Sequence, residues 1–289
     1  MNKVPSGNSW IVSAKASKYI YFLNYDRSKN TAINCVMLKT YKIITRYFKG
    51  QARLSRVDFR PIGCIIVAMQ KIKDILVAGD GSAVRNNFEK IADNISLVSS
   101  QIRARDSNDV IAAEAQRLLR YAAKQITALS RCGKSEIDVV AWRARNLFEA
   151  LLTFKYVIRS NENAMEFFRQ RGRDEKDILE ALLKYSDALE SKKLILERIS
   201  EIDSAILATG DDGVKIWRTP ILAEWVDMKD EYESFYKLYS KYVHPSSWII
   251  NAEYWEQGQH WEILLITAQL YANACLGEGK HFQSDRENY

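Results

Sequence analysis

The segment VVAWRARNLFEALLTFKYVI, Val139 to Ile158, is apolar on most sides when it is drawn as a helix. At 100° per residue, Asp138, Arg145, Glu149 and Tyr156 fall within about 40° of one another and form its polar side. A helix that is apolar on most sides belongs at the centre of a fold. The sequence therefore predicts a central helix in which Arg145 and Glu149 are partly buried and paired at i, i+4. This pair either fixes the packing register or holds Arg145 toward an anionic ligand, for which a planar guanidinium is suited.

The rest of the chain from about Pro61 has helical periodicity nearly throughout. Because helices must bury their apolar stripes on one another, we expect an all-α, multi-helix bundle. The expected parts are a basic, aromatic-rich segment (1–60) with a minor β signal, a helical domain (61–277) and a loose polar tail (278–289). Expected helices cover about 61–78, 83–104, 108–131, 135–159, 161–172 (ended by Gly172), 174–208 (bent or divided once), a short piece near Pro220, 229–244 and 254–276.

The bulk composition is that of a soluble protein of 289 residues, with 47% hydrophobic and 27% charged residues. No uncharged apolar run is long enough to span a membrane, and the N-terminus lacks the apolar core of a signal peptide. The four cysteines are far apart and form no C-x-x-C pair, so we expect them to be reduced. These features predict a cytoplasmic protein with no membrane partner.

The positive charge is concentrated at the N-terminus. Residues 1–60 contain 12 Lys and Arg and only two acids, whereas the remainder carries 30 Lys and Arg against 34 Asp and Glu. Such a segment either contacts an anionic partner, with bases stacking on its interleaved aromatics, or packs on the acidic body. The cations predicted to bind nucleic acid are Lys15, Lys18, Lys42, Arg46, Lys49 and Arg53.

A histidine directly before a proline ends another predicted helix, in YSKYVHPSSW (Tyr239 to Trp248). Pro245 disfavours helical geometry at His244, which then lies at a helix C-terminus, where the partial negative charge favours the imidazolium. An imidazole that is accessible in both charge states can act as general acid or base. Ser240 lies four residues earlier and Lys237 seven, near the same face. The alternative is a histidine that only caps the helix.

Several other kinds of site are not predicted. The sequence has no P-loop, no H-E-x-x-H and no G-x-S-x-G. The other histidines have no cysteine or acid at ligand spacing, so neither a metal site nor a cofactor is expected.

Two segments together resemble a known family. RNLFEALLTFKYV (145–157) and YSKYVHPSS (239–247) are similar to the R-x-x-x-E and S-x-x-x-H-P segments of an uncharacterised bacterial helical family. That family lies near the HEPN superfamily (higher eukaryotes and prokaryotes nucleotide-binding), and the resemblance covers about residues 85–277. The HEPN motif places an Arg four to six residues before a His. No Arg occupies that window before His244; Lys237 has the right distance, with six residues between, but is a Lys.

The resemblance implies a helical bundle, often a homodimer, and for many members a metal-independent endoribonuclease of toxin–antitoxin or phage-defence systems. RNA and an antitoxin or defence-system protein are the implied partners. In such a mechanism, a base takes the RNA 2′-hydroxyl proton and the oxygen attacks the adjacent phosphorus. Arg145 or Lys237 would neutralise the phosphate charge, His244 would move the proton, Glu149 would orient Arg145, and Ser240 would orient His244 or a phosphate oxygen. The alternative is a non-catalytic module that binds a nucleotide, nucleic acid or a protein, and the missing Arg favours it.

Overall fold

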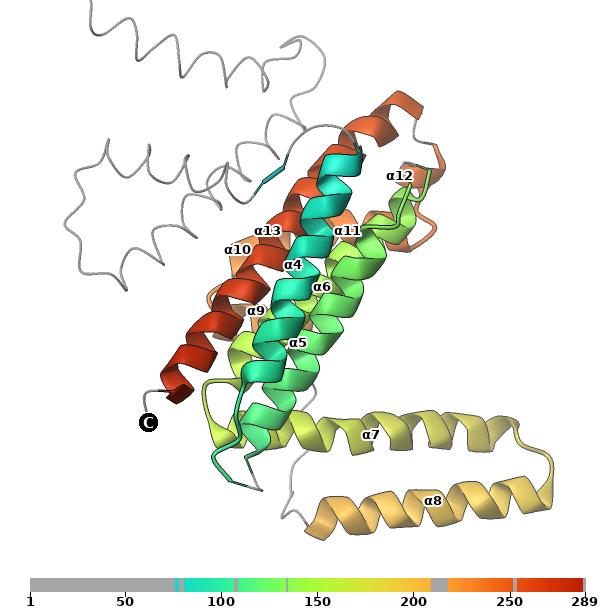
Figure 1. Ribbon diagram of the computed structural model, residues 1–289. Coiled ribbons are helices and arrows are strands. Elements are labelled where there is room, and N and C mark those ends of the chain that lie inside the picture. Colours follow the sequence, from blue (N-terminus) through green and yellow to red (C-terminus); the bar gives the residue numbers. More distant parts are fainter. Residues whose placement is uncertain are drawn as a thin grey trace, which may run out of the picture. The chain divides into compact units, whose positions relative to one another are not determined.

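The computed structural model describes residues 76–77, 81–106, 109–133, 135–208, 218–251 and 254–287. All of them belong to one compact unit, Lys73–Tyr289. The basic segment 1–60, its six predicted nucleic-acid-binding cations and nearly all of the helix expected over 61–78 lie outside the described residues. Within the described ranges the protein is an all-α bundle without strands, as the periodicity predicts (Figure 1).

The core of the bundle is a ring of long helices: α4 (Gly81–Gln101), α5 (Val110–Leu129), α6 (Ile137–Val157) and α13 (Tyr254–Glu287). Each helix packs on the next, and α13 closes the ring by packing on both α6 and α4 (Figure 1). The apolar stripe of each helix faces this ring, which removes the stripes from water. The largest fully buried side chains of the ring are Phe88, Ile95, Leu119, Ile126, Leu147, Phe148, Leu151, Leu152, Phe154 and Leu264.

The helix α6 occupies the central position predicted for it. It contacts α5 and α13, and also α7 (Asn161–Tyr185), α9 (Thr219–Trp225) and α11 (Lys237–Val243), which follow it in the chain. Twelve of its 21 residues are buried. Its outward stripe contains Trp142, Arg145, Asn146, Glu149 and Thr153, all exposed or half-buried, so α6 carries one polar strip on an otherwise apolar surface.

The segment after residue 218 is built from short helices, of which α9 and α11 pack on α6. They are α9 (Thr219–Trp225), α10 (Lys229–Glu231), a π-helical turn η1 (Tyr232–Tyr236), α11 (Lys237–Val243) and α12 (Ser247–Ile250). The Trp225 ring stacks on Tyr156, near the end of α6, and Tyr236 contacts Arg145, three turns earlier. The chain from α9 to α11 therefore runs opposite to α6.

The prediction that Gly172 ends a helix is wrong. Helix α7 (Asn161–Tyr185) continues through Gly172, and α8 (Leu189–Ala208) follows after the break at residues 186–188 (Figure 1). A glycine inside a helix costs only about 1 kcal/mol, and here a Cβ on Gly172 would lie 3.5 Å from Ile202 and Ile206 of α8. The single break predicted in the helix over 174–208 is therefore found at residues 186–188, where it forms the turn of a helical hairpin.

The expectation of a loose tail after residue 277 is also wrong, because α13 continues to Glu287. Three contacts hold this last part on the bundle. Phe282 is buried, Gly279 lies against Leu119 and Val98, and Arg286 pairs with Asp109, which caps α5. Although its composition is polar, the tail is therefore helical and packs one face on α4 and α5.

Candidate functional site

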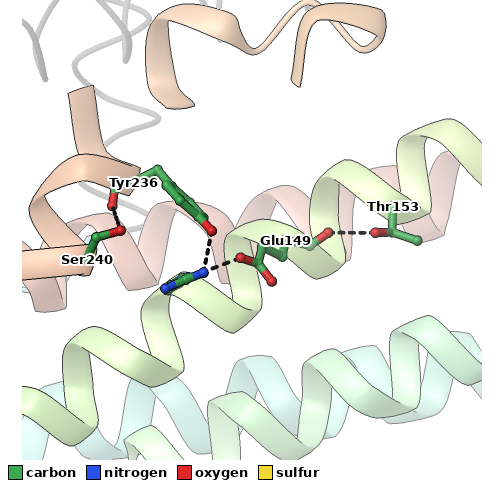
Figure 2. Close-up of polar contacts among 5 residues, drawn as sticks. Glu149, Thr153, Tyr236 and Ser240 are labelled. Carbon is green, nitrogen blue, oxygen red and sulfur yellow. Dashed lines mark hydrogen bonds and ion pairs between the residues drawn. The ribbon is translucent and has the colours of Figure 1, made fainter. Parts of the chain in front are cut away.

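The predicted pair on α6 is formed. Arg145 Nε donates to Glu149 Oε1 at 3.1 Å, one helical turn away. The side chains are 21% and 35% exposed, respectively, so the pair lies at the surface of the bundle and remains accessible to solvent. Thr153 Oγ1 donates to the Glu149 carbonyl at 2.9 Å and continues the polar strip along α6 (Figure 2).

A tyrosine from the π-helical turn completes the environment of Arg145. The guanidinium lies over the Tyr236 ring, 4.4 Å from its centroid, and Nη2 donates to the Tyr236 hydroxyl. Tyr232 stacks on Tyr236 at 4.7 Å between ring centroids. Arg145 is therefore held by Glu149, by a hydroxyl and by a ring face.

Glu149 affects the pKa of two tyrosines from different helices. Burial raises the pKa of Tyr236 above its usual value, and the negative charge of Glu149 raises it further, against the effect of Arg145. Burial likewise raises the pKa of Tyr121 on α5, again with Glu149 adding to the shift and Arg143 opposing it. The Glu149 carboxylate thus acts electrostatically on one ring of α5 and on one of η1.

Sequence reasoning did not find Tyr121 or Tyr236 as parts of this site. Helical periodicity relates residues of one helix, whereas Tyr236 is 91 positions from Arg145. One signal was present: Tyr232 and Tyr236 recur at i, i+4 in a segment rich in charge, and such a spacing places both rings on one face. A π-helical turn is another feature that short-range patterns do not predict, and such turns are frequent at functional sites.

The hydroxyl of Ser240 is directed to the backbone. Ser240 Oγ donates to the Tyr236 carbonyl at 2.9 Å, within its own helix (Figure 2). The Ser240 hydroxyl thus contacts the turn that carries Tyr236, and the structure records no contact of this hydroxyl with the His244 side chain.

His244 ends α11 in the predicted manner. Its backbone is extended, with φ −112° and ψ 144°, and its amide donates to the Ser240 carbonyl at 3.3 Å. The side chain is exposed, as are those of Lys237 and Lys241 on the same short helix. An exposed imidazole can exchange protons with a bound ligand.

The predicted residues divide into two groups. Arg145, Glu149 and Ser240 gather around Tyr236, whereas His244 lies eight residues beyond Tyr236, about 12 Å further along the helix axis. Since α11 runs opposite to α6, His244 lies toward the N-terminal end of α6. Lys237 adjoins the first group, because it directly follows Tyr236. Among the described residues, the structure records no contact between Arg145 and His244.

No described part of the chain contains three or more His, Cys, Asp or Glu side chains placed to hold a metal ion. Among the described helices, none is both long and apolar enough to cross a membrane.

Comparison with known proteins gives one match. No curated protein and no solved structure matches the chain. Over residues 121–259, somewhat less than half of its length, the chain is similar to a family of unknown function, DUF5677. This range begins at Tyr121 and includes Arg145, Glu149, Tyr236 and His244.

Proposed function

We propose that the protein is a metal-independent endoribonuclease, related to the HEPN superfamily, in which His244 moves the proton. The observation that carries this proposal is the exposure of His244 at the end of a helix whose other exposed residues include Lys237 and Lys241. A histidine sealed among apolar side chains could not reach an RNA strand. The HEPN resemblance suggests a homodimer and an antitoxin or defence-system partner as its setting.

The proposed chemistry is attack by the RNA's own 2′-hydroxyl. A base removes the proton of a 2′-hydroxyl, the oxygen attacks the adjacent phosphorus, and the bond to the 5′-oxygen breaks as that oxygen takes up a proton. The products are a 2′,3′-cyclic phosphate and a 5′-hydroxyl. His244 is the candidate for one of the two proton transfers, and Lys237, seven residues before it, is the candidate cation for a phosphate next to the scissile one.

Arg145 acts on a different phosphate in this proposal. Tyr236, which contacts Arg145, lies eight residues before His244, about 12 Å along the helix axis, so Arg145 would bind a neighbouring phosphate of the same strand rather than the reacting one. Glu149 and Tyr236 fix its guanidinium through the 3.1 Å pair and the ring contact at 4.4 Å, which makes them positioning residues. Ser240 contributes indirectly, through its bond to the Tyr236 carbonyl.

A second candidate function is supported by the same cluster. The guanidinium of Arg145 already has Glu149 and Tyr236 as partners, and the HEPN spacing of Arg and His is absent. Both features suit a non-catalytic module that binds RNA, a nucleotide or a protein through this surface.

The test compares wild type with His244→Ala, using the purified full chain, end-labelled single-stranded RNA and EDTA in the buffer. His281→Ala is the matched control, since His281 is also exposed and lies on α13, where it pairs with Asp285. We expect fragments with cyclic phosphate ends from wild type and His281→Ala, and none from His244→Ala. Equal cleavage by wild type and His244→Ala would exclude the assigned role. Intact RNA that nevertheless binds wild type would favour the non-catalytic module.

A further inference from the structure

We infer that the body of the protein binds single-stranded RNA along the exposed face of α5, with phosphates on a basic stripe and bases on two exposed rings at the border with α6. The inference rests on the proposed function in its choice of RNA as ligand. It concerns a surface that the cleavage proposal does not use, and it adds a binding site within the described body to the one expected in the N-terminal segment.

The basic stripe consists of Arg117, Arg120, Lys124 and Arg131. At 100° per residue these positions fall within about 60° of one another, on one face of α5 and of the turn that continues it. All four side chains are exposed. From Arg117 to Arg131 the stripe is about 21 Å long at 1.5 Å per residue, enough to contact several successive phosphates of an extended strand.

Acidic side chains neutralise little of this charge. The acid within α5 is Glu114, which is buried and bonded to Arg117. Glu89 of α4 reaches the end of α5, where Ser130 Oγ donates to it at 3.4 Å. The structure records no ion pair of Arg120, Lys124 or Arg131 with any described carboxylate. Such a stripe attracts a polyanion and releases its counterions on binding.

Two aromatic side chains lie beside the stripe. Tyr121 is 42% exposed and Trp142 of α6 is 44% exposed. Arg143 lies between them: its guanidinium is 4.4 Å from the Trp142 ring centroid, its charge acts on Tyr121, and Nη1 donates to Gln125 at 2.8 Å. Exposed rings beside cations are the combination with which proteins hold unpaired bases. An acidic protein would not need the rings, and a membrane surface would need more apolar side chains here.

The surface also leads to the proposed reaction centre. Tyr121 interacts with Glu149, the partner of Arg145. Arg131 lies in the turn that enters the N-terminal end of α6, and His244 lies toward that same end. A strand that follows α5 thus runs beside the polar strip of α6 that carries Arg145 and Glu149, so the bound bases precede or follow the cleaved bond.

The experiment measures binding of a labelled 20-nucleotide single-stranded RNA by fluorescence anisotropy, at several salt concentrations. The full chain carries His244→Ala throughout, so that cleavage does not consume the probe. The charge variant is Arg120→Gln/Lys124→Gln/Arg131→Gln. Its control, Lys184→Gln/Lys193→Gln/Lys280→Gln, removes the same charge from exposed positions of α7, α8 and α13.

We expect the charge variant to bind at least about tenfold more weakly, with the salt dependence of log K reduced by about 2 because three phosphate contacts are lost. The control should bind like the parent protein. Trp142→Ala and Tyr121→Ala should each weaken binding roughly fivefold or more without changing the salt dependence. Duplex RNA should compete poorly, since its bases are not available for stacking.

Equal affinity and equal salt dependence of the charge variant and its control would overturn the inference. So would binding of vesicles containing phosphatidylserine through Arg120, Lys124 and Arg131 in the absence of RNA binding. Failure of the cleavage proposal has a different signature: wild type leaves RNA intact, while binding still depends on the stripe. Conversely, cleavage that requires His244 but is indifferent to the charge variant would contradict the stripe alone.

Discussion

Arg145 shows what a single helix can and cannot reveal in its sequence. Its pairing with Glu149 follows from i, i+4 spacing and is formed at 3.1 Å. Its contact with Tyr236 depends on how a segment 91 positions later packs on α6, and no periodicity encodes that. The end of a helix at His244 was predictable for a local reason, the proline that follows it. The roles in cleavage given to Arg145, Glu149, Lys237, Ser240 and His244 remain predictions.

At this scale, the hydroxyl of Tyr236 should contribute measurably to stability. Tyr236→Phe keeps the ring under the guanidinium but removes the acceptor for Arg145 Nη2. We expect a loss of about 1 kcal/mol in the free energy of unfolding, because hydrogen bonds to charged groups exceed the average for neutral ones and this one is partly exposed. Urea denaturation measures it.

Tyr232→Phe is the control for this change. Its ring stacks on Tyr236, and the substitution preserves that stacking. An effect below about 0.5 kcal/mol is therefore expected for it. If both substitutions lower the free energy of unfolding by the same amount, the hydrogen bond between Tyr236 and Arg145 does not contribute the expected stability.

At the scale of elements, the sequence predicts most helices but fails where a local signal is overridden by packing. Gly172 and the polar residues after Leu276 both looked like helix ends. In the structure Gly172 faces Ile202 and Ile206, while Phe282 is buried against the bundle. The contacts that decide both cases come from other helices, so a reading of local composition could not include them.

The two glycines that lie inside helices against a neighbour should respond oppositely to alanine. At Gly172 the nearest atoms would lie 3.5 Å from an added Cβ, an ordinary contact, so Gly172→Ala should stabilise by about 0.5–1 kcal/mol through helix propensity. At Gly279 the added Cβ would meet Leu119 at 3.1 Å and Val98 at 3.3 Å. Overpacking there should outweigh the propensity gain and destabilise by about 1 kcal/mol. Denaturation midpoints of the two variants decide this, and a stabilising Gly279→Ala would show that α13 can shift.

A buried ion pair is one of the contacts that hold the end of α13 on the bundle. Asp109 caps α5 by accepting from the Ala112 amide at 3.0 Å, accepts from the Arg105 amide at 2.8 Å, and pairs with Arg286. The side chains of Asp109 and Arg286 are only 8% and 7% exposed. Asp109→Ala removes the cap and leaves a buried cation, so we expect a loss of about 3 kcal/mol or more.

Arg286→Ala should cost less, about half as much, since the two backbone amides still compensate the carboxylate. Arg85→Ala, at an exposed position of α4, is the control and should stay within about 0.5 kcal/mol of wild type. The same denaturation experiment ranks all three. The reverse order of Asp109→Ala and Arg286→Ala would mean that the cap contributes little.

Over the whole described unit, burial is distributed unevenly. Helix α6 has twelve buried residues, whereas α8 has one, Ile202. The α7–α8 hairpin is joined instead by ion pairs such as Arg198 with Glu175 and Lys176 with Asp203, whose side chains are 30–50% exposed. Exposed pairs of this kind each contribute less than about 1 kcal/mol. The hairpin should therefore open separately from the bundle that carries Arg145.

Hydrogen exchange followed by mass spectrometry tests this division. Amides of α8 should exchange far faster than those of α6, because local opening requires little apolar burial to be lost. Arg198→Ala, which removes the contacts with Glu175 and Glu201, should speed exchange in α7 and α8 and leave α6 unchanged. Equal protection of α6 and α8 would mean that the hairpin and the bundle unfold as one cooperative unit. In that case a ligand bound on α5 and α6 would also slow amide exchange in α8. If the hairpin opens independently, the ligand slows exchange only in the bundle.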